Sequence, residues 1–318
     1  MDNRRSDHIR YEVVSLERQI GNTPLVDLSN LVVNPQVTIL AKQEWQQLGG
    51  SIKARPAFNI IKQAIFGGQL LPGQHLLDAS SGNTGIAYAI IGEALGIPVT
   101  ICLPQNASSE RINLLKKHKV EIIFTSPFGS TDEAQVKALM LSRQNPDKYF
   151  YADQYANENN WRAHYQTTAN EILKQSDNRL THFVCGLGTT GTFVGTGRRL
   201  KEKNSSITLV SLQPSLALHG LEGWKHLSTA TVPPIYDRSI ADYSLEVSTE
   251  SAYEMIKKVD DTYGYKISPS SAANLVGSTQ VAESITSGVI ITMFPDNADN
   301  YGEVMKQIFS KGEYEIKN

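Results

Sequence analysis

The sequence predicts an α/β protein made of two doubly wound, open-sheet lobes with a cleft between them. Short β-branched runs alternate with longer helical patterns along most of the 318 residues, which is typical of βαβ units and mostly parallel sheets. The chain is also longer than one core usually serves, about 250–300 residues. A polar stretch at residues 145–160 interrupts the alternation. We therefore expect a smaller domain over residues 46–150 and a larger one over residues 1–45 and 151–318.

The expected elements follow from local patterns. Strands are expected where β-branched and apolar residues concentrate, at residues 37–42, 75–80, 99–103, 121–125, 182–186, 207–212 and 288–294. Helices are expected where apolar residues recur with helical spacing, at residues 57–65, 86–95, 110–118, 131–143, 193–203, 250–263 and 272–284. Gly96 directly follows one of these helices and is a good stop signal.

Composition limits the classes of function. Thirty basic and 32 acidic residues give a net charge of −2, which argues against a nucleic-acid or anionic membrane surface. No apolar run approaches the roughly 20 residues that span a bilayer, and the polar N-terminus lacks the apolar core of a signal peptide. Cys102 and Cys185 lack CxxC partners, so no disulfide framework or metal site is expected. A reducing cytoplasm fits this cysteine usage best.

One glycine-rich segment carries a phosphate-binding signal. Gly186-Leu187-Gly188-Thr189-Thr190-Gly191-Thr192 follows an expected strand and opens an expected helix, where backbone N–H groups and the helix dipole favour an anion. The segment matches GxGxxG, but a dinucleotide site needs an acidic residue about 20 positions later. The next strand ends in Gln213-Pro214-Ser215 instead. The threonine hydroxyls suit a compact phosphate monoester, and the alternative is a turn that only packs helix on strand.

A second loop has the same placement. Ser80-Ser81-Gly82-Asn83-Thr84-Gly85 lies between an expected strand and helix. Its backbone amides and hydroxyls could hold a carboxylate as readily as a phosphate. Asn and Ser are also ordinary turn and cap residues, so a purely structural role stays open.

A lysine precedes the first expected helix of the smaller domain. In Gly49-Gly50-Ser51-Ile52-Lys53-Ala54-Arg55-Pro56, Ser51 is a candidate N-cap, and Pro56 fits only within the first turn. Lys53 then sits at the positive end of an apolar helix, which favours a neutral amine or an imine over an ammonium. The alternative is a solvated surface lysine.

A serine-rich segment opens a later helix. The residues are Ile267-Ser268-Pro269-Ser270-Ser271-Ala272-Ala273-Asn274. Their hydroxyls could cap the helix or could face a heterocyclic nitrogen. The Cys, His, Asp and Glu residues of the sequence show no metal-ligand spacing, and no serine lies in a GxSxG context.

Taken in their order along the chain, these four segments resemble the fold-type II pyridoxal-phosphate enzymes, whose fold is tryptophan synthase β-like. The resemblance is to the cysteine synthase (O-acetylserine sulfhydrylase) family, and most closely to its B-type branch. Two further segments are similar to that family, Ile20-Gly21-Asn22-Thr23-Pro24-Leu25-Val26 and the stretch from Asp153-Gln154-Tyr155-Ala156-Asn157 to His164-Tyr165-Gln166-Thr167-Thr168. The likeness covers most of the chain.

The resemblance implies residue roles. Lys53 would hold pyridoxal 5′-phosphate covalently and act as acid and base, and Asn83 would bond the 3′-oxygen of the cofactor. Ser270 would face the pyridine nitrogen, where a neutral hydroxyl leaves the ring unprotonated. The phosphate would be bound by Gly188, Thr189, Thr190, Gly191 and Thr192. The carboxylate of the amino acid would be bound by Ser80, Ser81, Gly82, Thr84 and Gln154.

The sequence departs from the family pattern at several positions. Ala54 replaces an aspartate beside the lysine, Pro269 and Ser271 flank the serine at 270, and Asn297 and Asn300 stand where the family has arginines. These changes leave the leaving group on the serine (acetyl or phosphate) and the sulfur donor open.

The resemblance implies β-replacement of an activated serine by sulfide or thiosulfate, giving cysteine or S-sulfocysteine. It also implies a homodimer, and raises the question of a serine acetyltransferase tail as a partner. The alternatives are a serine/threonine dehydratase, a β-synthase that uses another nucleophile, or a weakly active regulatory homologue.

Overall fold

The structure is a computed structural model that describes residues 2–310. The described chain forms two compact units. The first unit contains the chain up to Asn22, then Gln47–His164 and Pro233–Ile235. The second unit contains Thr23–Gln46, Tyr165–Val232 and the chain from Tyr236 onward. The units are defined by compactness and do not test the predicted domain bounds. The bounds at residues 46 and 150 therefore stay a prediction. Residue 1 and residues 311–318, which the larger predicted domain takes in, lie outside the described part.

The first unit is built on a four-stranded sheet with the order β5-β4-β3-β6. All neighbouring strands are parallel, with Leu76 opposite Val99 and Tyr149 opposite His75. The elements of this unit are α1 (Asp2–Glu17), the 3-10 helix η2 (Leu48–Gly50), α2 (Ala54–Phe66), β3 (His75–Ala79), α3 (Asn83–Leu95), β4 (Val99–Pro104), α4 (Ser109–Lys117), β5 (Glu121–Thr125), α5 (Ser130–Gln144) and β6 (Tyr149–Tyr151). Helix α6 (Glu158–Gln166) begins in this unit.

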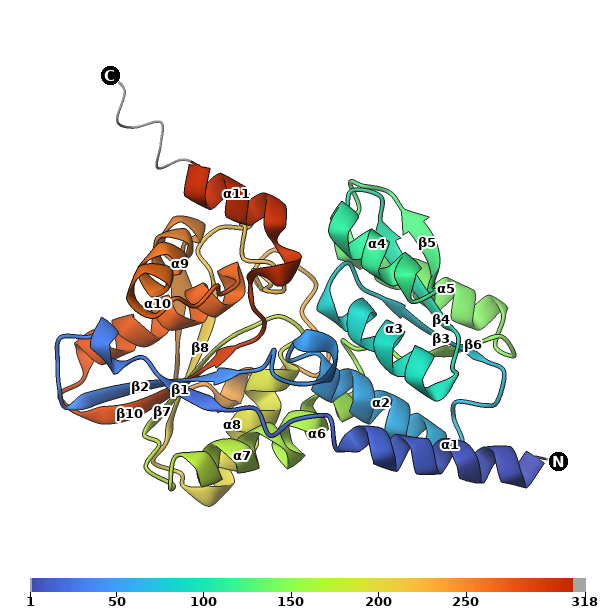
Figure 1. The fold of residues 1–318 in the computed structure, drawn as a ribbon, viewed down its shortest axis with the longest axis horizontal. Coiled ribbons are helices and arrows are strands. Elements are labelled where there is room, and N and C mark those ends of the chain that lie inside the picture. The colour runs from blue at the N-terminus through green and yellow to red at the C-terminus, as the bar shows by residue number, and fades with distance from the viewer. Residues whose placement is uncertain (1, 311–318) are drawn as a thin grey trace. The chain divides into compact units, whose positions relative to one another are not determined.

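The second unit is built on a six-stranded sheet with the order β1-β2-β10-β7-β8-β9. Only β1 is antiparallel to its neighbour, and β2 and β10 run side by side in Figure 1. The elements are β1 (Leu25–Asp27), η1 (Ser29–Leu31), β2 (Val37–Gln43), α7 (Thr168–Gln175), β7 (His182–Gly186), α8 (Gly191–Lys203), β8 (Thr208–Pro214), η3 (Arg238–Ile240), β9 (Tyr243–Val247), α9 (Thr249–Tyr263), α10 (Pro269–Ser284), β10 (Gly288–Phe294), η4 (Ala298–Asn300) and α11 (Gly302–Ser310). The predicted α/β class with mostly parallel open sheets is confirmed.

Each unit has its own apolar core. Strand residues such as Val184 and Ile290 pack with Ile256 and Leu275 in the second unit. In the first unit α1 joins the core through Val13, which is completely buried, and α1 lies along α2 in Figure 1. Each fully buried side chain of this kind contributes about 1.5–3 kcal/mol, so the packing of α1 is a substantial part of this unit.

Several elements escaped prediction because their sequences carry weak signals. Strands β1 and β6 have only three residues each, too few to show an alternating pattern. Strand β6 lies inside the polar stretch at 145–160, which was expected to interrupt the alternation of strands and helices, and it pairs with β3. Helices α1, α6, α7 and α11 and strand β9 also lie outside the predicted set.

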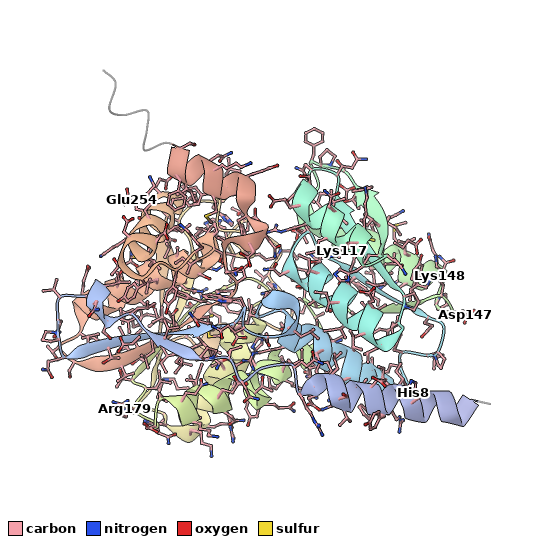
Figure 2. The ribbon with its side chains drawn as sticks, viewed as in Figure 1. His8, Lys117, Asp147, Lys148, Arg179 and Glu254 are labelled. Carbon is pink, nitrogen blue, oxygen red and sulfur yellow. The ribbon has the colours of Figure 1, made fainter. Side chains whose placement is uncertain are left out.

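Several charged side chains lie on the outside of the units. Lys117, Asp147, Lys148, Arg179 and Glu254 are all exposed, as Figure 2 shows. Within residues 2–310, no helix combines the length and the apolar character needed to cross a membrane.

Candidate active site

The strand order of the first unit places two loops side by side. The chain runs from β3 outward to β4 and β5, and then returns to pair β6 on the other side of β3. The order therefore reverses between β3 and β6, and ligands of open α/β sheets bind beyond the carboxyl ends of the strands at such a point. The loop that follows β3 begins at Ser80, and the segment that follows β6 contains Gln154.

Hydrogen bonds join these two loops. The hydroxyl of Thr84 donates to Oε1 of Gln154 (2.7 Å), and Nε2 of Gln154 donates to the carbonyl of Ala79 (2.8 Å). Oγ of Ser80 accepts from the amides of Gly82 (3.3 Å) and Gly85 (3.0 Å), so this side chain braces the loop from inside.

Helix α3 begins at Asn83, within the loop. The positive end of its dipole therefore lies at this loop, where a negative charge is favoured. Ser81, Gly82 and Asn83 are half-buried, while Ser80 and Thr84 are buried.

A buried carboxylate that the sequence reasoning missed lies beneath this loop. Asp78 is fully buried at the carboxyl end of β3. Its Oδ1 accepts from the amide of Ala79 (2.8 Å), and its Oδ2 accepts from the amide of Gln154 (3.2 Å). Burial raises the pKa of Asp78 to about 7, and the charge of Asp153 adds to the rise. An acidic residue inside an otherwise apolar strand was the signal that could have identified it.

The segment that contains Lys53, residues 49–56, packs on helix α3. A Cβ at Gly49 would lie 3.8 Å from Cα of Ala87 in α3 and 3.7 Å from Cβ of Ala54 in α2. Lys53 occupies the N-cap position of α2 and is half-buried. The prediction that Ser51 caps α2 is wrong, because Lys53 holds that position. The hydroxyl of Ser51 instead accepts from the amide of Lys53 (3.3 Å).

The second unit also has a point where its strand order reverses, between β7 and β10. The glycine-rich loop follows β7 and leads into α8. A Cβ at Gly188 would lie 2.0 Å from the carbonyl oxygen of Gly223, so no other residue fits there. Thr190 caps α8 in the left-handed region (φ 71°), an uncommon conformation for a β-branched residue that clusters at ligand sites.

The glycine-rich loop fits a phosphate. Oγ1 of Thr190 is buried and meets no hydrogen-bond partner among the described residues, although buried hydroxyls are normally paired. Thr189 is also buried, and Thr192 is half-buried in the first turn of α8. A phosphate at the helix start would give the hydroxyl of Thr190 a partner.

The serine-rich segment lies at the start of α10. Ser268 caps this helix by accepting from the amide of Ser271, and Pro269 follows at the first helical position. Ser270 is buried, and its hydroxyl lies 3.4 Å from Oδ1 of Asp296. Tyr301 donates to the other oxygen of Asp296 (2.6 Å). Ser270 is therefore not the cap, and its hydroxyl lies within hydrogen-bond distance of a buried carboxylate.

Asn274, one turn after Ser270, ties α10 to the glycine-rich loop. Its Oδ1 accepts from the amide of Gly186 (2.7 Å), and its Nδ2 donates to the carbonyl of Met293 (2.9 Å). This second missed residue thus links the ends of β7 and β10. An amide inside a buried helical stretch was its only sequence signal.

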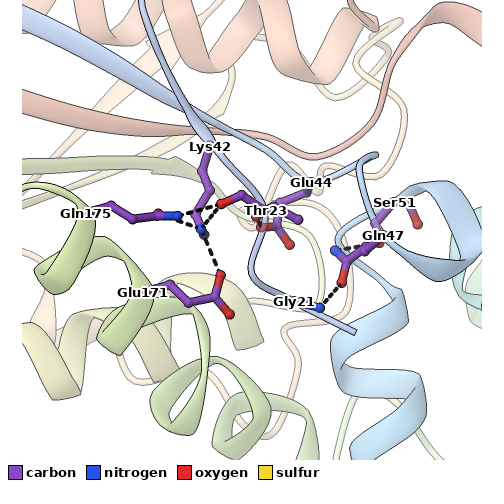
Figure 3. Close-up of polar contacts among 8 residues, drawn as sticks. All are labelled: Gly21, Thr23, Lys42, Glu44, Gln47, Ser51, Glu171 and Gln175. Atoms are coloured by element: carbon purple, nitrogen blue, oxygen red, sulfur yellow. Dashed lines mark hydrogen bonds and ion pairs between the residues drawn. The ribbon is translucent and has the colours of Figure 1, made fainter. Parts of the chain in front are cut away.

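The segment around Thr23 has a structural role within the second unit. The hydroxyl of Thr23 donates to Glu44 (2.5 Å), and its carbonyl accepts from Nζ of Lys42 (2.7 Å). Lys42 is fully buried and pairs with Glu171 (2.8 Å), while Gln175 donates to the same carbonyl (Figure 3). A buried charge of this kind needs such a complete set of partners.

The predicted residues thus fall into two groups. In the first unit are Lys53, Ser80, Ser81, Gly82, Asn83, Thr84 and Gln154. In the second unit are Gly188, Thr189, Thr190, Gly191, Thr192 and Ser270. No group of three or more His, Cys, Asp or Glu side chains within the described residues could hold a metal ion.

Comparisons with known proteins show the family to which the chain belongs. The family of pyridoxal-phosphate dependent enzymes matches residues 16–296. A cysteine synthase of Aquifex aeolicus is 40% identical, over 89% of this chain and 88% of its own. Cysteine synthase B of Salmonella typhimurium is 33% identical, over 94% and 98% of the two chains.

Two further proteins extend the comparison. An O-acetylserine dependent cystathionine β-synthase of Bacillus subtilis is 32% identical, over 94% of this chain and 99% of its own. The crystal structure of a cysteine synthase from Entamoeba histolytica superposes with a TM-score of 0.85 at 31% identity, over 95% and 91% of the two chains. The chain belongs to the pyridoxal-phosphate dependent enzymes, and within them to the cysteine synthase family in its B-type branch.

Proposed function

We propose that the protein makes cysteine by β-replacement, with O-acetylserine or a similarly activated serine as donor and sulfide or thiosulfate as nucleophile. One observation carries the proposal: the lysine segment packs on α3, the helix whose start forms the predicted carboxylate loop. A lysine beside an amino-acid site is what chemistry at the α-carbon needs. Thiosulfate in place of sulfide would give S-sulfocysteine.

The residues of the first unit have proposed roles toward the amino acid. Ser81 and the N-terminal end of α3 bind its carboxylate, and Thr84 is held in place by Gln154. One N–H of the Gln154 amide goes to Ala79, and the second is the proposed donor to the carboxylate. Lys53 takes the proton from the α-carbon, and the protonated amine then returns a proton after the nucleophile has added. Acetate departs from the β-carbon with the electron pair of its C–O bond.

Pyridoxal phosphate, when bound, supplies an electron-withdrawing ring that stabilises negative charge on the α-carbon. Lys53 is the proposed covalent attachment point, and Asn83 is the proposed donor to the 3′-oxygen. Gly188 to Thr192 are proposed to hold the phosphate, which the buried hydroxyl of Thr190 supports. Ser270 is proposed to face the pyridine nitrogen, and its neutral side chain favours elimination over chemistry that needs a stronger electron sink.

A second candidate function is a β-synthase that uses another nucleophile. The relative from Bacillus subtilis, whose name specifies O-acetylserine dependence and cystathionine synthesis, favours this candidate. Both reactions share the steps at Lys53 and differ only in what adds to the β-carbon. Product analysis with sulfide, thiosulfate and homocysteine offered together separates the two. Loss of acetate without any addition product would instead indicate a dehydratase-like or regulatory homologue.

The proposal also covers the oligomeric state and the cellular location of the protein. We propose a homodimer in the cytoplasm, with the C-terminal tail of a serine acetyltransferase as a candidate partner. Cys102 and Cys185 are buried in β4 and β7 and form no disulfide with each other, which is consistent with a reducing compartment. Sedimentation of the purified protein with and without a tail peptide tests both associations.

Reductive trapping tests the central assignment. The purified protein should absorb in the visible range, and adding O-acetylserine should change that spectrum. Borohydride reduction followed by peptide mapping should place the cofactor label on Lys53, and Lys53→Ala should lose both label and turnover. A label on any other lysine would contradict the proposal.

A further inference from the structure

The side-chain amide of Gln47 joins two backbone segments of the first unit. Its Oε1 accepts from the amide of Gly21 (2.9 Å), and its Nε2 donates to the carbonyl of Ser51 (3.2 Å), as Figure 3 shows. Gly21 belongs to one of the segments that resemble the family, and Ser51 lies two residues before Lys53. The two segments are far apart in sequence, and Gln47 connects them through a single planar group.

The chain between Gln47 and Lys53 has little regular structure to hold it. Gly49 and Gly50 both have positive φ, 80° and 62°, in a 3-10 helix of only three residues. Such a stretch is conformationally permissive. Its carboxyl end is fixed at Ser51, whose carbonyl accepts from Gln47 and from the amide of Ala54 (3.1 Å).

We infer that Gln47 is a positioning residue that sets the place of Lys53 by tying Ser51 to Gly21. The inference rests on the proposed role of Lys53. A glutamine amide offers an acceptor oxygen and an N–H donor group in a single plane, and this site uses both atoms. A carboxylate offers acceptors alone, so Gln47→Glu keeps the bond from Gly21 and sets an oxygen against the carbonyl of Ser51.

The test compares Gln47→Glu with Gln46→Glu, which makes the same change at the adjacent, exposed glutamine. Gln46 donates to Gln43 and does not bond Ser51. We expect Gln47→Glu to lower kcat for cysteine formation about tenfold, with the KM for O-acetylserine changed less than about twofold. It should also shift the pH midpoint of the bound cofactor's visible absorbance and speed hydrogen exchange at the amides of 51–54.

Three results would overturn the inference. The first is a kcat and a pH midpoint in Gln47→Glu equal to those of Gln46→Glu. The second is a loss of activity that tracks the melting temperature alone. If Gln47→Glu does not fold, Gln47→Met, which is similar in length and uncharged, takes its place. The third overturning result is then a kcat and a cofactor absorbance in Gln47→Met that equal those of the wild type.

Trapping in the wild-type protein keeps this test separate from that of the proposed function. A borohydride label on a lysine other than Lys53 overturns the proposed function, and the role of Gln47 with it. A label on Lys53, together with variants that behave as the control does, overturns the role of Gln47 alone.

Discussion

Replacing Asp78 by Asn should change how the free energy of unfolding depends on pH. The carboxylate is fully buried, and it accepts from two backbone amides, those of Ala79 and Gln154. Burial raises its pKa from 3.8 to about 7 in the folded protein, and the charge of Asp153 adds to the rise. The folded state therefore binds a proton on Asp78 more strongly than the unfolded state does.

The magnitude follows from that difference. Stability is greatest when Asp78 is protonated in both states, and it falls as pH rises from about 4 toward 7, where only the unfolded state has released the proton. A difference of about three pKa units corresponds to a loss of about 4 kcal/mol, complete above pH 7. An asparagine does not titrate, so Asp78→Asn lacks this loss. Any amide left without its acceptor costs a nearly constant amount at every pH.

The assay is urea unfolding at intervals between pH 4 and 8, followed by tryptophan fluorescence. The free energy of unfolding of Asp78→Asn, minus that of the wild type, should rise by about 4 kcal/mol between pH 4 and 7 and then level off. Asp147→Asn, at an exposed position, is the control and should show no such rise. A difference for Asp78→Asn that stays constant across the whole range would refute the reasoning.

Three further predictions concern the second unit. Gly188→Ala should greatly weaken cofactor affinity, because the added Cβ would lie 2.0 Å from a backbone oxygen. Gly85→Ala is the control and should not weaken it, since the atoms nearest to its Cβ lie at 3.5 Å. Equal affinities of the two variants in equilibrium titrations would contradict this prediction. Replacing Thr189 and Thr192 together by Val should weaken cofactor binding about tenfold or more, since each neutral hydrogen bond contributes about 0.5–1.5 kcal/mol, and unchanged binding by a folded double variant would count against the loop as the phosphate site. Ser270→Ala should change the cofactor absorbance with little change in melting temperature, because a different serine caps the helix; the opposite pattern would retire the ring-facing role.

Local patterns in the sequence were enough for the fold class and for most elements. The alternation of β-branched runs with helical periods reflects burial of strands beneath helices, which is a local property of each segment. The glycine-rich loop and the loop at 80–85 were found because glycine and hydroxyl residues at a strand-to-helix turn are a local signature too. The resemblance of the segments around Lys53 and Ser270 then led to the family that the comparisons confirm.

Only the tertiary structure decided which of these segments meet within each unit. The place of β6 beside β3 brings Gln154 to Thr84 and Asp78, and the place of β10 beside β7 brings Asp296 to the start of α10. Strand order depends on pairing between segments distant along the chain, so a local pattern of residues does not contain it. The caps of two helices also depended on the folded backbone. Serine is a common N-cap residue, so Ser51 and Ser270 were candidates for the starts of α2 and α10. In the structure the N-cap of α2 is Lys53, and that of α10 is Ser268.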